Sequence, residues 1–208
     1  MKLDEIYGHG GLFKTPIVGQ RILAAALDTA VTDVYKRQEV EPYVPDKEKV
    51  MNSLKNLSKE IGARRVHWRY DPVFIHEKYT VDFHIQCFEK MAKNLSGYVS
   101  SAVISFIDLY QKTKKNFPNV RVVTRKEQET LMEAFAKTGK KYGITIRTCC
   151  ENKEFAKYGV DVSGCMTQQV MEKSLGYLLK VPKSKSVRQE CNCLLGNDIG
   201  MYLSLIHI

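Results

Sequence analysis

The sequence predicts an α/β fold built around an incomplete parallel sheet, and three observations support this prediction. Apolar residues recur at helical spacing in four segments between residues 46 and 178, and short strand patterns separate these segments. One strand pattern, at residues 102–107, is a continuous apolar run, which is typical of a parallel strand covered on both faces. The order is a helix followed by three strand–helix (βα) units. This order indicates part of a (β/α) barrel, because three strands cannot close one.

The first predicted helix and strand lie between residues 45 and 72. Pro45-Asp46 is a helix start signal, and Gly62 ends a helical periodicity of five apolar residues, namely Val50, Met51, Leu54, Leu57 and Ile61. Residues 66–70 then alternate between apolar and polar side chains, as a strand does. We expect Asp71-Pro72 to break this strand, because the residue before a proline is restricted and proline lacks an N–H group.

The helix of the first strand–helix unit begins at Thr80, its predicted N-cap, and ends at Gly97. Its apolar face consists of Val81, Ile85, Phe88, Met91 and Leu95. The continuous apolar run at residues 102–107 is the next strand.

The helix of the second unit starts at a capping box, formed by Thr124 and Glu127, and ends near Gly143. Residues 144–146 form the third predicted strand. A final helix follows, with Thr167 as its cap and an apolar face of Val170, Met171, Leu175 and Leu178.

Composition places the chain among cytoplasmic globular proteins. Hydrophobic residues make up 44% and charged residues 26% of the 208 residues, which argues against general disorder. The longest aliphatic run, at residues 22–27, is too short to span a bilayer, and no apolar run near the start indicates a secretory signal. We therefore expect a reducing compartment and no membrane partner. In that compartment the six cysteines are thiols or metal ligands rather than disulfides.

The formal net charge of +9 raises the question of a polyanionic partner. The basic residues are dispersed, however, and the small groups at residues 112–115 and 183–188 lack the interleaved aromatic side chains of a nucleic-acid platform. Solvated loops explain both groups better. Nucleic acid is thus a minor alternative to an unknown small-molecule or macromolecular substrate.

Polar side chains gather where the predicted strands end, which is where (β/α) barrels carry their chemistry. Four of them are candidate catalytic residues: Arg69 and Asp71 after the first strand, Asp108 after the second and Glu151 after the third. Structural explanations also exist, because Arg69 and Asp71 can pair with each other and Asp108 can cap a loop. Ser105 lies at the same end of the second strand.

Five of the six cysteines fall within 45 residues of the last part of the chain, at Cys149, Cys150, Cys165, Cys191 and Cys193. The Cys191-Asn192-Cys193 spacing is too tight for the usual zinc knuckle but can supply thiolates to a cluster or a soft metal. Spacing alone leaves structural zinc, an iron–sulfur cluster and free thiols open. His84 and Cys87, three apart on a predicted helix, lack a matching second pair and are interpreted as packing residues.

Several motifs follow one another between residues 67 and 202: His67-Trp68-Arg69-Tyr70-Asp71-Pro72, Val103-Ile104-Ser105-Phe106-Ile107-Asp108, Thr148-Cys149-Cys150-Glu151, Gly164-Cys165, Cys191-Asn192-Cys193 and Asp198-Ile199-Gly200-Met201-Tyr202. In this order they resemble the bacterial family catalogued as domain of unknown function 1848. The resemblance covers residues 39–202. The resemblance implies that four cysteines, Cys149, Cys165, Cys191 and Cys193, ligate an auxiliary metal. It also implies that four polar residues line the mouth of the barrel at the carboxyl ends of the strands, namely Arg69, Asp71, Asp108 and Glu151. Cys150 is extra by this pattern.

The resemblance also implies a cofactor. Members of the family usually continue after the position of Tyr202 into a Cys-x-x-x-Cys-x-x-Cys segment, similar to the radical-SAM loop that holds three irons of a [4Fe–4S] cluster. Residues 203–208 contain no cysteine. We therefore expect an iron–sulfur cluster, with S-adenosylmethionine only in a full-length parent and with zinc as the alternative metal.

The first 38 residues have a different character. Residues 8–15 are glycine-rich like a phosphate-binding loop, but Phe13 stands where that loop needs a glycine before its lysine. Residues 4–32 resemble a stretch near the C-terminus of the FGGY carbohydrate kinases, without that family's sugar-binding domain or catalytic aspartate. We interpret residues 1–32 as a foreign, sugar-kinase-like fragment.

Two hexapeptides suggest how the pieces were joined. Residues 203–208 can be encoded by CTG TCT CTT ATA CAC ATC, whose reverse complement encodes residues 33–38. The shared sequence resembles the transposase mosaic end used in sequencing libraries. We therefore expect residues 33–38 and 203–208 to be translated adapter sequence that flanks a partial α/β domain at residues 39–202.

Taken together, the sequence favours a fragment of an iron–sulfur, radical-SAM-like bacterial enzyme of unknown substrate that is inactive by itself. The first alternative is a metal- or nucleic-acid-binding α/β module without catalysis. The second, which rests on residues 4–32 alone, is a carbohydrate kinase fragment.

Overall fold

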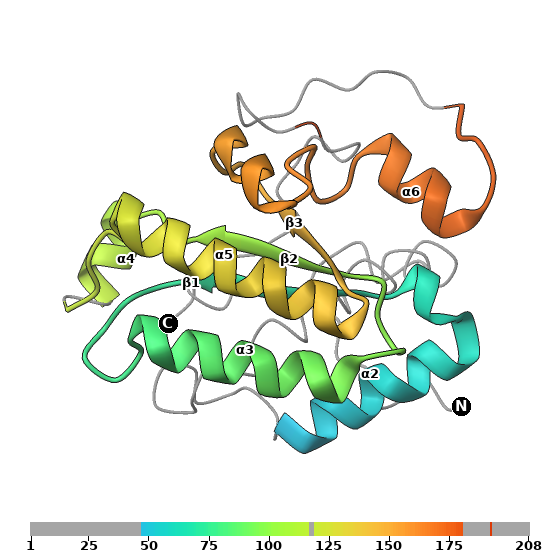
Figure 1. Cartoon of the computed structure of the whole chain (residues 1–208), viewed down its shortest axis with the longest axis horizontal. Coiled ribbons are helices and arrows are strands. Elements are labelled where there is room, and N and C mark those ends of the chain that lie inside the picture. Colours follow the sequence, from blue (N-terminus) through green and yellow to red (C-terminus); the bar gives the residue numbers. More distant parts are fainter. Residues whose placement is uncertain (1–46, 117–118, 181–191, 193–208) are drawn as a thin grey trace.

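The computed structural model describes residues 47–116, 119–180 and Asn192, and these residues form an α/β fold around a parallel sheet (Figure 1). The sheet is open and three-stranded, with the order β1-β2-β3, so the predicted fold class is confirmed. The elements in chain order are α2 (Lys47–Ile61), η3 (Ala63–Arg65), β1 (His67–Val73), α3 (Val81–Leu95), β2 (Ser101–Phe106), α4 (Gln111–Asn116), α5 (Arg125–Tyr142), β3 (Thr145–Thr148), η4 (Lys153–Tyr158) and α6 (Gln168–Leu175).

The segments with a predicted foreign origin, residues 1–32, 33–38 and 203–208, lie outside the described residues. So do Cys191 and Cys193. Within residues 47–116 and 119–180, no helix is both long enough and apolar enough to cross a bilayer.

Three helices begin at the predicted caps. The side chain of Thr80 accepts a hydrogen bond from the backbone N–H of Phe83, and Thr167 caps α6 in the same way. Thr124 and Glu127 form the reciprocal capping box at the start of α5. These caps satisfy backbone N–H groups that the first turn of a helix otherwise leaves without partners.

The end of α6 differs from the prediction. The helix stops at Leu175 because Gly176 adopts a left-handed conformation with φ of 84° and forms the C-cap. Leu178, which was expected on the apolar face of this helix, lies beyond it and is 84% exposed. Helical spacing alone cannot detect such a stop, because the periodicity continues past the glycine.

Strand β1 is longer than predicted. It continues through Asp71-Pro72 to Val73 instead of ending at Tyr70. The pairing with β2 is irregular between Tyr70 and Val73, and this irregularity accommodates a proline that has no N–H group to donate. As a result, Asp71 is a strand residue rather than a loop residue.

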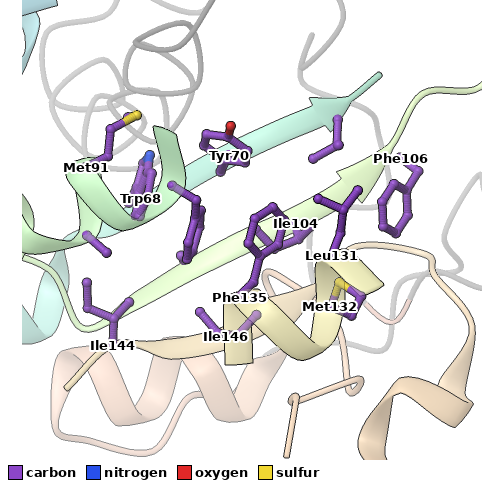
Figure 2. Packing of buried hydrophobic residues seen from close by; sticks show 14 of the residues in the cluster. Trp68, Tyr70, Met91, Ile104, Phe106, Leu131, Met132, Phe135, Ile144 and Ile146 are labelled. Carbon is purple, nitrogen blue, oxygen red and sulfur yellow. The ribbon is translucent and has the colours of Figure 1, made fainter. Parts of the chain in front are cut away.

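One face of the sheet carries the main hydrophobic core. Trp68 and Tyr70 on β1, Ile104 on β2 and Ile146 on β3 point toward α3 and α5, which lie side by side on this face (Figure 2). Phe135 of α5 is fully buried, and its ring centroid lies 4.2 Å from that of Phe88 on α3. Alternate residues of each strand share this face because the side-chain period of a strand is two.

The opposite face of the sheet is largely polar. His67, Arg69 and Asp71 alternate with the core residues of β1, and Arg147 does so on β3. Helix α6 packs on this face near the strand starts, where Ser174 Oγ lies 2.8 Å from His67 Nε2 (α6 is the orange helix in Figure 1). The third βα unit therefore places its helix across the sheet from α3 and α5.

His84 belongs to the core rather than to a metal site. It is fully buried on α3, its Nε2–H donates to the Phe74 carbonyl at 2.8 Å, and its Nδ1 accepts from the Tyr70 hydroxyl at 2.9 Å. Burial lowers the pKa of His84 to about 4, even though the bond to Phe74 acts in the opposite direction.

We expect the protein to lose stability as the pH falls from about 6.5 to about 4. In this window the unfolded chain binds a proton at His84 that the folded chain excludes, so the free energy of unfolding decreases as the pH decreases. At about 1.4 kcal/mol per pKa unit, the loss attributable to His84 is about 3 kcal/mol. Urea titrations across this window measure it.

His84→Gln is the matched comparison, because glutamine forms hydrogen bonds but does not titrate. The pH dependence of the variant should be shallower, and His67, whose pKa burial and Arg147 lower to about 4, supplies the remaining slope in both proteins. Equal slopes in the two proteins would contradict the assignment.

Candidate functional site

The polar face of the sheet contains a buried ion pair on β1. The Arg69 guanidinium donates to the Asp71 carboxylate through Nη2 at 2.5 Å and through Nε at 3.3 Å. Ser105 of β2 donates to Asp71 Oδ2 at 3.2 Å. Arg69 is 2% and Asp71 3% exposed, so bulk water does not screen this network.

The electrostatic environment keeps Arg69 charged. Burial alone favours the neutral guanidine, but the carboxylate of Asp71, through its charge and its hydrogen bonds, outweighs burial and raises the pKa of Arg69 above its usual value. Arg69 and Asp71 therefore stay charged as a pair.

Those two cysteines form a buried pair at the end of β3. Cys149 and Cys165 are each 4% exposed, and their Sγ atoms lie 3.5 Å apart. Both pack against Val103 of β2. Hydrogen bonds to Cys150 and Cys165, together with burial, raise the pKa of Cys149 above that of an ordinary thiol, while Arg69 acts in the opposite direction. Without a metal, Cys149 stays protonated at neutral pH.

Strand register places Arg69 beside this pair. Arg69 of β1 is paired with Val103 of β2, and Val103 is paired with Arg147 of β3, so the three residues form one row across the polar face. Cys149 follows Arg147 by two residues and therefore continues on the same face. The cysteine pair thus lies next to this row, just past the carboxyl end of β3.

A comparison with known protein families gives one match. The family described as domain of unknown function (DUF1848) matches residues 17–208, which is most of the chain. The chain belongs to the DUF1848 family. No curated protein and no solved structure matches the chain.

The DUF1848 match begins 22 residues before the predicted start of the family-like segment at residue 39 and runs through both hexapeptides. It gives no support to the sugar-kinase resemblance of residues 4–32 or to an adapter origin of residues 33–38 and 203–208. Those two interpretations, and the domain boundaries that depend on them, stay predictions.

The remaining candidate catalytic residues of this DUF1848 protein lie at the ends of β2 and β3. The carboxylate of Glu151 accepts a hydrogen bond from the backbone N–H of Phe106 at 2.7 Å, which joins the loop after β3 to the end of β2. Asp108 is exposed and accepts a hydrogen bond from the Tyr110 hydroxyl at 3.3 Å. The structure thus unites Arg69, Asp71 and Ser105 in one network and places Glu151 beside it.

Asn192 is the one described residue of the Cys191-Asn192-Cys193 motif. Its side-chain amide donates to the backbone carbonyl of Ser163 at 3.4 Å, two residues before Cys165. A Cβ atom on Gly164 would lie 3.9 Å from the Cβ of Asn192. The centre of this motif therefore lies against the loop that carries Cys165.

Within residues 47–116, 119–180 and 192, no group of three or more His, Cys, Asp or Glu side chains is arranged to hold a metal ion. Cys149 and Cys165 bring two sulfurs within 3.5 Å of each other but are not part of such a group.

Sequence reasoning missed two polar contacts that organise this face of the DUF1848 sheet. His67 Nδ1 accepts a hydrogen bond from the Ser101 hydroxyl at 2.7 Å, and its Nε2–H donates to Ser174 Oγ. The Ser174 hydroxyl in turn donates to the backbone carbonyl of Val170. Arg147 pairs with Asp161 at 2.6 Å. The alternation of His67, Arg69 and Asp71 along β1 was the available signal, because polar residues at period two indicate a polar sheet face.

Proposed function

We propose that this DUF1848 chain holds a thiolate-bound metal centre through Cys149 and Cys165, with Cys191 and Cys193 as the further ligands. In this proposal the chain is part of an iron–sulfur, radical-SAM-like protein of unknown substrate. The observation that carries the proposal is the 3.5 Å separation of two buried sulfurs on the polar face of the sheet.

The separation of the sulfurs restricts the kind of centre. Two thiolates on one tetrahedral zinc lie about 3.8 Å apart, given Zn–S bonds of about 2.3 Å. The Cys149–Cys165 separation of 3.5 Å is close to this value. In a cubane [4Fe–4S] cluster each thiolate binds a different iron, and the sulfurs lie much farther apart. The pair therefore suits a shared ion, either zinc or one iron of a smaller cluster.

The position of Asn192 supports the choice of the other two ligands. Its contact with Ser163 places the middle residue of the Cys191-Asn192-Cys193 motif next to the Cys165 loop. When bound, such a metal orders its ligands or transfers single electrons, depending on whether it is zinc or iron.

The proposal assigns catalysis to a longer parent. Cleavage of S-adenosylmethionine needs the three closely spaced cysteines that residues 203–208 do not contain. Asp108 and Glu151 would then face the substrate of the parent protein at the carboxyl end of the sheet, whereas Arg69 and Asp71, at 2% and 3% exposed, would not touch it.

The first experiment is metal loading of the full chain. Purified protein is exposed to Zn²⁺, and separately to iron and sulfide without oxygen, and bound metal is quantified by mass spectrometry and visible absorption. We expect the unaltered chain to retain metal and Cys149→Ala and Cys165→Ala to lose it, because each removes one of the proposed thiolate ligands of a shared ion.

Cys87→Ala is the matched control, since Cys87 is a partly buried cysteine on α3, whose Sγ lies 3.9 Å from the sulfur of Met91. It should bind as much metal as the unaltered chain. Colour after iron loading identifies an iron–sulfur centre, whereas retained zinc without colour identifies a metal-binding module. Metal content that is equal in all variants, or absent from the unaltered chain, rejects the site.

A further inference from the structure

We propose that Cys149 and Cys165 are a redox modification site, at which a peroxide oxidises the two thiols to a reversible disulfide. The observation behind this inference is that two buried sulfurs, 16 residues apart in the sequence, lie 3.5 Å from each other. The inference goes beyond the proposed function and does not rest on it, because a disulfide needs these two side chains and no metal ion.

Backbone hydrogen bonds hold the chain on each side of the pair. The N–H of Cys149 donates to a carbonyl of β2 at 3.0 Å. Asp161 is bonded to β3 in both directions, since its N–H donates to the Ile146 carbonyl at 2.9 Å and its carbonyl accepts from the Thr148 N–H at 3.0 Å. Cys165 follows Asp161 in the segment that leads to α6. Strand pairing therefore brings the two sulfurs together.

The distance between the sulfurs suits a disulfide. The bond is about 2.05 Å long, so the two sulfurs have to approach each other by about 1.5 Å. Cys150 is a poor alternative partner for Cys149, because neighbouring Cα atoms lie about 3.8 Å apart and unstrained disulfides span about 4.4 to 6.8 Å. The geometry thus selects Cys165 as the partner of Cys149.

A peroxide fits both the burial and the chemistry of the pair. Each cysteine is 4% exposed, which favours a small oxidant. The sulfur that first loses its proton attacks one oxygen of hydrogen peroxide, the O–O bond breaks, and hydroxide leaves, so that a sulfenic acid forms. The second sulfur then attacks the first, the S–S bond forms, and the S–O bond breaks as water leaves. The sulfurs lose two electrons, the peroxide gains two, and the two thiol protons end in two molecules of water.

Oxidation of the pair has two consequences. The disulfide closes a loop over residues 149–165, which restricts the unfolded chain and should stabilise the fold. In the oxidised chain neither sulfur is a thiolate, so the pair does not bind the ion of the proposed function. A small thiol reverses both effects, because it reduces the disulfide by exchange.

The test treats the reduced full chain, stripped of metal by a chelator, with hydrogen peroxide at neutral pH. After the remaining thiols are blocked, trypsin releases Cys149 within residues 148–153 and Cys165 within residues 158–173. Mass spectrometry should find these two peptides joined, and dithiothreitol should separate them. Oxidation should also raise the urea concentration at the midpoint of unfolding.

Serine variants identify the sulfurs that react. Cys149→Ser and Cys165→Ser should each abolish the linkage and the rise in the unfolding midpoint. Cys150→Ser is the matched control, because Cys150 is the half-buried neighbour of Cys149 in the same peptide, and it should keep both. Circular dichroism establishes that each variant is folded. If a variant does not fold, fragmentation of the joined peptides from the unaltered chain still shows which cysteine is linked.

Three results overturn the inference: the two peptides stay separate, the linkage uses Cys150 in place of Cys149, or the oxidised chain unfolds at a lower urea concentration than the reduced chain. The proposed function fails separately. A disulfide in a chain that binds neither zinc nor iron supports the inference and rejects the metal centre. A chain that binds metal through Cys149 and Cys165 but forms no disulfide rejects the inference alone.

Discussion

Replacing Phe135 with alanine is expected to lower the free energy of unfolding by about 3 to 5 kcal/mol. Phe135 is fully buried between α5 and the sheet, where its ring contacts those of Phe88 and Tyr70 (Figure 2). The substitution removes this apolar surface and leaves a cavity that neighbours on two helices and a strand cannot close. Urea unfolding followed by circular dichroism measures the loss.

Two further variants test the cause. Phe135→Leu keeps most of the volume and should be much less destabilising than Phe135→Ala. Val122→Ala removes an apolar side chain that is 63% exposed, and it should change the free energy of unfolding by less than about 0.5 kcal/mol. Similar losses in Phe135→Ala and Val122→Ala would show that the aromatic cluster does not hold α3 and α5 to the sheet.

Breaking the Arg69–Asp71 pair from one side is the second large effect. Arg69→Met should lower the free energy of unfolding by about 3 to 5 kcal/mol, because it leaves the carboxylate of Asp71 buried without a countercharge. Adding Asp71→Leu removes that charge and should restore most of the stability. The pair is thus expected to be costly to break but not essential to folding.

A double-mutant cycle measures this coupling through the midpoints of urea unfolding of the four proteins. If the losses of the two single variants simply add in the double variant, the ion pair seen in the structure does not form in solution. If the double variant is as stable as the unaltered chain, the fold does not depend on the ion pair.

The helices and strands could be predicted because their signals lie within a few residues of each other. Thr124 and Glu127 are three residues apart, and the side chain of each accepts a hydrogen bond from the backbone N–H of the other. The start of α5 can therefore be predicted from the sequence. The continuous apolar run of β2 likewise reflects local composition, and all six of its residues are buried. Short-range patterns such as these determined the element order and the fold class.

The candidate site was only partly predictable. The sequence placed Arg69, Asp71 and Glu151 at one end of the sheet, and it selected Cys149 and Cys165 by residue type. That Asp71 is a strand residue depends on the irregular pairing of β1 with β2, which no pattern within β1 records. The position of α6 on the polar face likewise depends on Ser174 meeting His67 across 107 residues.

The sequence by itself therefore determined the α/β class, the helix starts and the residue types available for chemistry, because periodicity and capping act over one or two helical turns. Only the tertiary structure decided that two thiols 16 residues apart lie 3.5 Å from each other beside a buried Arg69–Asp71 pair. The physical reason is that the register between strands, and the way the loop after β3 folds back, set the distances between these side chains. Both arise from packing between segments that are remote in the sequence.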